Sequence, residues 1–319
     1  MQYITDVTEL QLHNTAIALG KFDGFHRGHQ LLLRQVKEWQ EQKGLQGVIF
    51  TFGRPLTDDK SETHGVSNSS MISQSIQGKH IDSHPEKLHK AERMGIDVLL
   101  EYPFTPAFAS KTPEKFIEEI LVKQLDVKAV TVGRDFRFGR NRSGDVSILQ
   151  EYGKQYGFEV VIFDKLELNQ EEISSSSIRD AILRGDMEFV CQAMGRGYSV
   201  YGEVIHGKGL GHTIDIPTIN QSVSGEKVLP PYGVYAARCH IGQHIVSGIA
   251  NLGCKPTVSD EMHVGLETHL FDFNQDIYGK MAEVELLKFI RHEQKFDGID
   301  ALLEQMKTDI RLVKKSLEA

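Results

Sequence analysis

The sequence of 319 residues predicts an α/β fold followed by an all-β fold. In the first half, short apolar runs alternate with amphipathic helical patterns, which indicates a parallel sheet with right-handed helical crossovers. In the second half, closely spaced strands separated by glycine turns predict a small antiparallel barrel, and a helix follows it. Because a chain of this length is long for a single core, we predict two domains, 1–186 and 187–319.

Composition argues against several classes of function. The chain is 40% hydrophobic and 25% charged, as in ordinary globular proteins, and its formal net charge of -8 argues against a nucleic-acid binder. The first residues do not resemble a signal peptide and no apolar run reaches transmembrane length, so we expect no membrane partner. Cys191, Cys239 and Cys254 fit neither a zinc site nor a disulfide framework, so we expect a cytoplasmic protein. The oligomeric state is not indicated.

The strands expected in the first half are short and apolar, as buried parallel strands are. They lie at 16–19, 47–52, 95–100, 127–132 and 158–163. Helices are expected at 28–43, after Pro85, from Pro113, through Ile148 and Leu149, and at 178–183. Residues 53–84 are rich in Ser, His, Asp and Gly, which predicts a surface loop, either a lid or an inert insertion.

The pattern changes between Gly185 and Gly197, where we expect the domain boundary. Strands are expected after it at 198–205, 234–239, 245–250, 267–273 and 282–287. A final helix from about Asp297 has an apolar face that we expect to pack on the barrel. That face consists of Ile299, Leu302, Leu303, Met306, Ile310 and Val313.

The first motif spans residues 16–32, where a strand, a glycine-broken turn and a helix start follow one another. His26 and His29 fall on one side of the first helical turn. A helix start offers unpaired N–H groups and a positive dipole end, so imidazoles there suit a polyphosphate and a departing pyrophosphate. The pattern also fits a surface helix with two solvated histidines. The expected phosphate-binding neighbours are Gly20, Phe22, Gly24 and Gly28. In this context the stretch resembles the signature of the nucleotidyltransferase superfamily.

A second motif, residues 133–140, follows the strand at 127–132. Ligands bind at the carboxyl ends of parallel strands, where Asp135 can accept hydrogen bonds, Phe136 can stack on a flat heteroaromatic ring, and Arg137 adds a positive charge. The alternative is a turn with core phenylalanines and solvated arginines.

A third motif is the serine run at 174–177, followed by Arg179. Serines cap helix N-termini, which explains one or two of them. Ser175, Ser176 and Arg179 would also form a second phosphate cradle, and the two cradles could hold one triphosphate from opposite sides.

The second half contains a glycine-rich basic loop after its first strand. Its expected phosphate-binding residues are Gly207, Lys208, Gly209 and Gly211. Thr218 and Asn220 provide hard oxygen ligands suited to Mg²⁺. Glu267 can serve as a general base that takes a proton from a substrate hydroxyl, or it can be an ordinary solvated strand residue.

Over nearly its whole length, the chain resembles the bacterial bifunctional riboflavin kinase/FAD synthetase family. The matching segments are 22–24, 26–30, 132–139, 173–179, 217–220, 233–235, 251–257, 267–269 and 276–279. The resemblance implies a Rossmann-like nucleotidyltransferase domain followed by a riboflavin kinase-like barrel.

The resemblance also implies two activities, with ATP as co-substrate and flavins as substrates and products. The barrel would phosphorylate riboflavin to FMN with Mg-ATP, with Thr218 and Asn220 as metal and phosphate ligands and Glu267 as base. The first domain would join FMN to the AMP part of ATP, giving FAD and pyrophosphate. Its phosphate-handling positions are His26, His29, Ser175, Ser176 and Arg179, and Asp135 is a ligand-binding position.

Several residues depart from the family pattern. Lys21 replaces Asn, Gly53-Arg54-Pro55 replaces Pro-His-Pro, and Ser176 replaces Thr. His212 replaces Arg and Asp215 replaces Gly in the kinase loop, which removes one fixed positive charge and adds a carboxylate near anions. The alternatives are therefore an FMN adenylyltransferase with an impaired kinase, or a flavin-binding regulator without catalysis.

Overall fold

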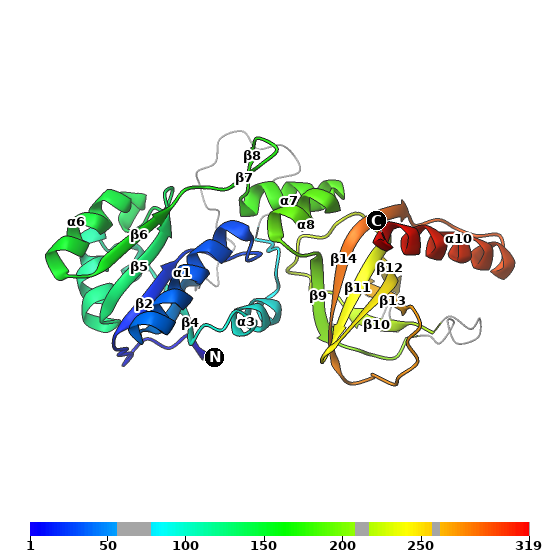
Figure 1. Cartoon of the computed structure of the whole chain (residues 1–319), viewed down its shortest axis with the longest axis horizontal. Helices are drawn as coiled ribbons and strands as arrows, with labels where there is room; N and C mark the ends of the chain where they lie inside the picture. The colour runs from blue at the N-terminus through cyan, green and yellow to red at the C-terminus, as the bar shows by residue number, and fades with distance from the viewer. Residues whose placement is uncertain (56–77, 208–216, 257–261, 319) are drawn as a thin grey trace. The chain divides into compact units, whose positions relative to one another are not determined.

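A computed structural model of the chain describes residues 1–55, 78–207, 217–256 and 262–318 (Figure 1). The chain divides into two compact units, Met1–Ser75 with Lys87–Ile173 and Ile76–Glu86 with Ser174–Ala319. The first unit is α/β and the second is antiparallel β with helices, which confirms the predicted fold class. The second unit includes the serine helix, whereas the predicted boundary at 186/187 assigns that helix to the first domain.

The first unit is built on a six-stranded parallel sheet in the order β1-β4-β3-β2-β5-β6. Its strands are β1 Gln2–Ile4, β2 Thr15–Leu19, β3 Gln46–Pro55, β4 Val98–Phe104, β5 Val127–Gly133 and β6 Glu159–Phe163. A small hairpin follows, with β7 Glu167–Leu168 and β8 Glu171–Glu172. The helices are α1 Arg27–Lys43, α3 His84–Arg93, α4 Pro106–Ala109, α5 Pro113–Lys115, η1 Phe116–Gln124, η2 Arg140–Arg142 and α6 Val146–Tyr156. The first three residues of α3 belong to the second unit. The short β1, which pairs with β4, was not predicted.

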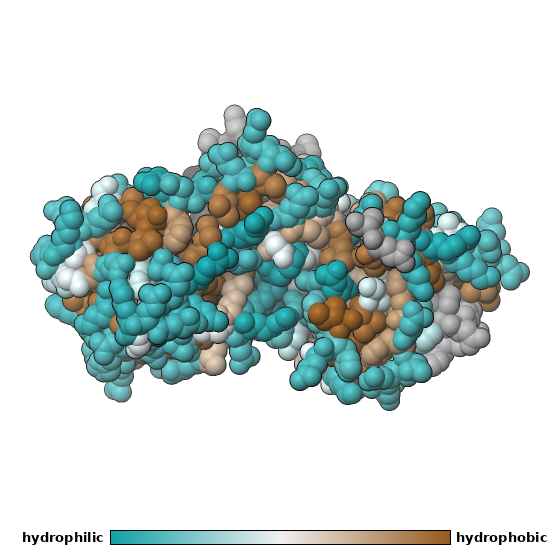
Figure 2. All heavy atoms as spheres, viewed as in Figure 1, coloured by the Kyte–Doolittle hydropathy of each residue, from teal (hydrophilic) through white to brown (hydrophobic). Residues whose placement is uncertain are grey.

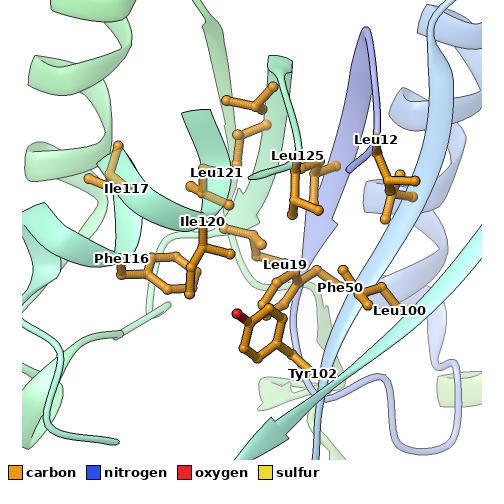
Figure 3. Packing of buried hydrophobic residues seen from close by; sticks show 14 of the residues in the cluster. Leu12, Leu19, Phe50, Leu100, Tyr102, Phe116, Ile117, Ile120, Leu121 and Leu125 are labelled. Carbon is orange, nitrogen blue, oxygen red and sulfur yellow. The ribbon is translucent and has the colours of Figure 1, made fainter. Parts of the chain in front are cut away.

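Two apolar clusters cover the two faces of this sheet. Ala16 and Ala18 face the α1 side, whereas Ile17 and Leu19 face the side of η1. Figure 3 shows the η1 side, where side chains of η1 point toward Leu19 and Phe50. η1 is the predicted helix after Pro113, but its hydrogen bonds reach the fifth residue, as from Leu125 N–H to the Ile120 carbonyl at 2.9 Å.

The second unit is a six-stranded antiparallel sheet in the order β10-β13-β12-β11-β14-β9, and a bridge between Ile205 and Asn220 brings its two ends together. The strands are β9 Tyr198–Glu203, β10 Ile219–Ser222, β11 Gly233–Ile241, β12 His244–Pro256, β13 Met262–Leu270 and β14 Met281–His292. The helices are α7 Ser175–Arg184, α8 Met187–Met194 and α10 Ile299–Glu318. Figure 2 shows that hydrophilic residues cover much of the visible face of each unit.

Helix α10 packs on β11 and β12, with Val313 fully buried. The expected apolar face is confirmed from Leu302 onward, but it is wrong for Ile299, whose side chain is 64% exposed. Ile299 is the first residue of α10, and Leu302, one turn later, is the first residue of the helix that lines the adjoining cavity.

A segment from the first half of the chain completes the second unit. Lys227 is fully buried and donates to the Glu86 carboxylate, to the Ile81 carbonyl at 2.9 Å and to the Ser199 carbonyl at 3.0 Å. The other Glu86 oxygen accepts from Tyr201 N–H at 3.1 Å. Residues 80–86 therefore provide the counter-charge of a buried lysine in the barrel unit.

Candidate active sites

The turn between β2 and α1 has an unusual backbone that two buried aromatic rings support. Phe22, Gly24 and Phe25 all have positive φ, at 49°, 80° and 39°, a region that only glycine enters easily. Both phenylalanine rings are fully buried, so core packing offsets the backbone cost. The Phe22 side chain therefore belongs to the core, and a place for Phe22 in the phosphate site stays a prediction. The predicted Gly20 lies against the Phe22 ring, where an added Cβ would come within 3.1 Å.

His26 and His29 meet at the N-terminus of α1. The His26 ring caps the helix, since its Nδ1 accepts from His29 N–H at 3.4 Å, and the two rings stack with centroids 3.7 Å apart. Because Nδ1 accepts, the proton of a neutral His26 lies on Nε2, which is then a donor. A Cβ on Gly28 would lie 3.2 Å from the His26 ring. The two imidazoles therefore form one unit at the positive end of a 17-residue helix.

Lys87 was not predicted as part of this region. Its Nζ donates to the Lys21 carbonyl at 3.1 Å and to Thr51 Oγ1 at 3.2 Å, while the Thr51 hydroxyl donates to the same carbonyl at 3.0 Å. These bonds join the turn after β2 to β3 and to α3. Nothing in the local sequence pattern distinguishes Lys87 from other helix-surface lysines.

The turn after β5 exposes Asp135, which forms an ion pair with Lys165 at 3.3 Å. The hydrogen bond to Glu172 raises the pKa of the Lys165 ammonium, and Asp135 raises it further. Phe136 is half-buried and stacks on Phe138 with centroids 5.7 Å apart. Arg137 is exposed and donates to the Phe136 carbonyl at 2.9 Å. Asp135, Phe136 and Arg137 thus lie together at a strand end, as predicted, and Phe138 lies in the core.

A further aromatic cluster lies near the ends of β3 and β4 and was missed from the sequence. Phe52, Phe104 and Phe108 have ring centroids 5.7 to 6.1 Å apart, and Phe104 remains 37% exposed. The rings come from separate segments, so only an expected strand order could have suggested their contact.

The run of four serines at the start of α7 uses two of them, Ser174 and Ser177, for capping. Ser174 Oγ accepts from Ser177 N–H at 3.1 Å, and Ser177 Oγ accepts from Ser174 N–H at 3.0 Å. Ser175 and Ser176 take no part in these two bonds, and Arg179 is half-buried in the next turn. The α7 residues belong to the second unit and the histidines to the first, so their joint hold on a triphosphate stays a prediction.

In the second unit, three polar side chains share one face of neighbouring strands. Glu267 on β13 pairs in register with Asn220 on β10 and with Asn251 on β12, so the three side chains project from the same face. Thr218 Oγ1 donates to Glu267 Oε1 at 2.8 Å. The predicted base and the predicted metal ligands are therefore neighbours, and their hard oxygens fit a magnesium ion.

Gly207 is required by its contact with Asn220. A Cβ at Gly207 would lie 2.3 Å from the Asn220 side-chain nitrogen, so only glycine leaves the amide in place. The other predicted residues of this loop, Lys208, Gly209 and Gly211, lie outside the described residues. The substitutions at His212 and Asp215 lie outside them as well.

A cavity of about 280 Å³ opens beside Thr218 and Glu267. The sheet supplies polar lining, with Asn251 and His269 added to those two residues, and apolar lining from Val234, Ile249 and Ala250. Helix α10 supplies an apolar lining on successive turns, from Leu302, Met306 and Ile310.

The helix is fixed over the cavity by a partly buried ion pair. Arg291 on β14 donates to both oxygens of Asp309 on α10, at 2.7 to 3.2 Å, and Gln305 donates to the same carboxylate at 2.8 Å. Asp309 is 2% exposed, so its carboxylate is shielded from solvent.

Two separate folds, one with imidazoles at a helix start and one with a carboxylate and a hydroxyl in a cavity, define a candidate two-domain phosphotransferase. Comparison with known proteins places the chain within that class. The model of the FAD synthetase family matches residues 8–177, and that of the riboflavin kinase family matches residues 194–317. The chain belongs to the bifunctional riboflavin kinase/FMN adenylyltransferase family.

Individual relatives agree over nearly the whole chain. The bifunctional riboflavin kinase/FMN adenylyltransferase of Haemophilus influenzae is 34% identical over 308 residues, 95% of this chain and 94% of that protein. The Bacillus subtilis protein of the same description is 34% identical over 299 residues, covering 92% and 90%. A crystal structure described as a macrolide-efflux protein from Streptococcus pneumoniae matches with a TM-score of 0.79 and 29% identity, covering 98% of each chain. In the described part of this chain, no helix has the length and apolarity to cross a membrane.

Proposed function

We propose that this protein converts riboflavin to FMN in its second unit and FMN to FAD in its first, using ATP in both reactions. Membership of the bifunctional family supports both activities. The single structural observation that carries the proposal is the Thr218–Glu267 contact at 2.8 Å, beside a cavity lined by both polar and apolar groups.

The cavity suits a flavin. Its apolar α10 lining fits the isoalloxazine ring, and the Glu267 side fits the hydroxylated ribityl chain. Glu267 would take the proton of the terminal hydroxyl as that oxygen attacks the γ-phosphorus of ATP in line, while the bond from that phosphorus to the β–γ bridging oxygen breaks and ADP leaves. Thr218 and Asn220 would hold Mg²⁺, which neutralises charge on the transferring phosphoryl group.

In the first unit, we assign the N-terminus of α1 to the phosphates of ATP. The His26 and His29 rings lie together at that end, and an Nε2–H donor can stabilise the negative charge that develops on departing pyrophosphate. Ser175, Ser176 and Arg179, at the start of α7 in the second unit, are proposed as phosphate donors from their residue types. We assign the flavin ring to two aromatic residues near the strand ends, the exposed Phe104 and the half-buried Phe136, with Asp135 and Arg137 at the same edge.

One assay tests the proposal. Purified protein is incubated with Mg²⁺ and ATP plus either riboflavin or FMN, and the products are separated by chromatography. We expect FMN and FAD from riboflavin, and FAD from FMN. FAD from FMN alone would mean an impaired kinase, and retained flavin without turnover would mean a binding protein.

We also propose a cytoplasmic location, which the three free cysteines support.

A further inference from the structure

His269 lies two residues after Glu267 on β13 and lines the same cavity. Its Nδ1 is 2.9 Å from the backbone carbonyl oxygen of Pro217, the residue immediately before Thr218. A carbonyl oxygen can only accept, so Nδ1 carries the proton and donates. The ring also rests edge-on against Phe271, with centroids 5.8 Å apart, which limits its rotation.

The bond from His269 to Pro217 lies just beyond the point where the pairing of β10 with β13 ends. β10 pairs with β13 from Ile219, opposite Thr268, to Ser222. Thr218 is the next residue outward and would stand opposite His269 if the ladder continued. The ladder stops there, and the imidazole instead bonds to the carbonyl of Pro217. A proline has no N–H, so its carbonyl is the backbone group through which this chain end can be held.

We propose that His269 is a positioning residue for the kinase site, which holds the Pro217–Thr218 peptide so that Thr218 Oγ1 stays beside Glu267. This inference rests on the proposed function, in which Thr218 is a metal ligand. A displacement of about 1 Å at a positioning group can cost about 100-fold in rate. The bond from His269 therefore acts on catalysis through Thr218, without a contact to the reacting atoms.

Two variants separate the hydrogen bond from the ring. His269→Phe keeps a planar ring against Phe271 but has no donor. His269→Asn loses the ring but places an amide N–H near the former Nδ1. We expect His269→Phe to lower kcat of FMN formation about 10- to 100-fold and to raise the Mg²⁺ concentration needed for half-maximal rate. The KM for riboflavin should change less than twofold, and His269→Asn should recover most of the rate.

FAD formation from FMN in the same molecules is the internal control, because none of the residues assigned to it lies on β13 or lines this cavity, and it should not change. Amide hydrogen exchange in the ligand-free protein supplies a readout that does not depend on turnover. The peptide that covers residues 217–222 should exchange faster in His269→Phe and at the original rate in His269→Asn. Unchanged exchange and an unchanged Mg²⁺ requirement in His269→Phe would overturn the inference, as would equal losses in both variants.

The variant Thr218→Ala separates a failure of this inference from a failure of the proposed function on which it rests. If Thr218→Ala abolishes FMN formation and His269→Phe does not impair it, the positioning role is wrong and the metal site stands. If Thr218→Ala retains full FMN formation, the metal-site assignment is wrong, and the positioning role of His269 is overturned with it.

Discussion

The two candidate sites in this chain use different parts of the polypeptide for related chemistry. In the first unit, the donors are backbone N–H groups and imidazoles at the start of α1. In the second, the functional groups are a hydroxyl, an amide and a carboxylate on neighbouring strands. A reaction that releases pyrophosphate chiefly needs donors for the leaving group, whereas phosphorylation of an alcohol also needs a base. The contrast predicts that each activity can be removed without the other.

The largest effect is expected from Glu267→Gln. Glutamine keeps the shape of the side chain and can still accept from Thr218, but it cannot take the proton of the flavin hydroxyl. We expect FMN formation to fall about 10²- to 10⁴-fold, measured by initial rates with riboflavin and Mg-ATP. FAD formation from FMN should stay unchanged. A fall of less than tenfold would mean that another group is the base.

His29→Ala is the converse variant. It removes an imidazole that stacks on His26 at the start of α1, so FAD formation should fall about 10²- to 10³-fold, while FMN formation stays nearly intact. His13→Ala, at an exposed position of the same unit, is the matched control and should change neither rate. If FMN and FAD formation fall together in His29→Ala, the two sites are not separable.

The fold class could be predicted from periodicity because each strand and helix carries its pattern locally. The role of residues 80–86 could not be predicted from periodicity. Glu86 and Lys227 are 141 positions apart, and each is an ordinary charged residue in its own segment. The prediction of a surface loop over 53–84 therefore missed that its last residues pack into the barrel unit. Only the three-dimensional structure shows that both charges are buried.

In the candidate sites, too, some contacts could be predicted from the sequence and others could not. The proximity of His26 to His29 was predicted from helical spacing, and the structure confirms it. Thr218 and Glu267 were singled out separately, with a solvated strand residue as the alternative for Glu267, and the structure brings the two together. Contacts made by unremarkable residues were missed, such as the bond from His269 to Pro217. Such a bond depends on where a strand pairing ends, which the pattern of apolar residues does not specify.

The buried ion pair between Lys227 and Glu86 predicts that loss of one lysine charge destabilises the second unit more than a similar loss destabilises the first. Lys227→Met leaves Glu86 buried without its counter-charge, which should cost about 3 to 5 kcal/mol. We expect the second unit to unfold at a temperature roughly 10 °C lower. The measurement is calorimetry together with loss of FMN formation on heating.

The double variant Lys227→Met with Glu86→Gln removes both charges and should recover part of the lost stability. Lys43→Met, which breaks an exposed ion pair with Glu159 in the first unit, is the control and should change stability by less than about 1 kcal/mol. Equal losses from the buried and exposed pairs would contradict the proposed role of residues 80–86.

Gly207→Ala tests the kinase site from its backbone. The new methyl group would displace the Asn220 amide, so we expect FMN formation to fall about tenfold and the Mg²⁺ requirement to rise. Gly225→Ala, where an added Cβ meets no atom within 4 Å, is the matched control in the same unit. An unchanged Mg²⁺ requirement in Gly207→Ala would argue against Asn220 as a ligand.

The smallest expected effect on the protein concerns the chemical reactivity of the cysteine thiols, all of which lie in the second unit. Burial raises the pKa of Cys191 to about 11 and that of Cys239 to about 12, whereas an unfolded thiol ionises near pH 8.5. Because the folded pKa values are raised, both side chains stay protonated at pH 9, where the unfolded chain is largely thiolate. We therefore expect iodoacetamide to modify these two residues slowly in native protein at pH 9 and rapidly in urea, as followed by peptide mass spectrometry. Lys227→Met should accelerate their modification without changing FAD formation from FMN at low temperature. If both thiols react as fast in the native protein as in urea, burial in the second unit does not protect them, and the prediction is wrong.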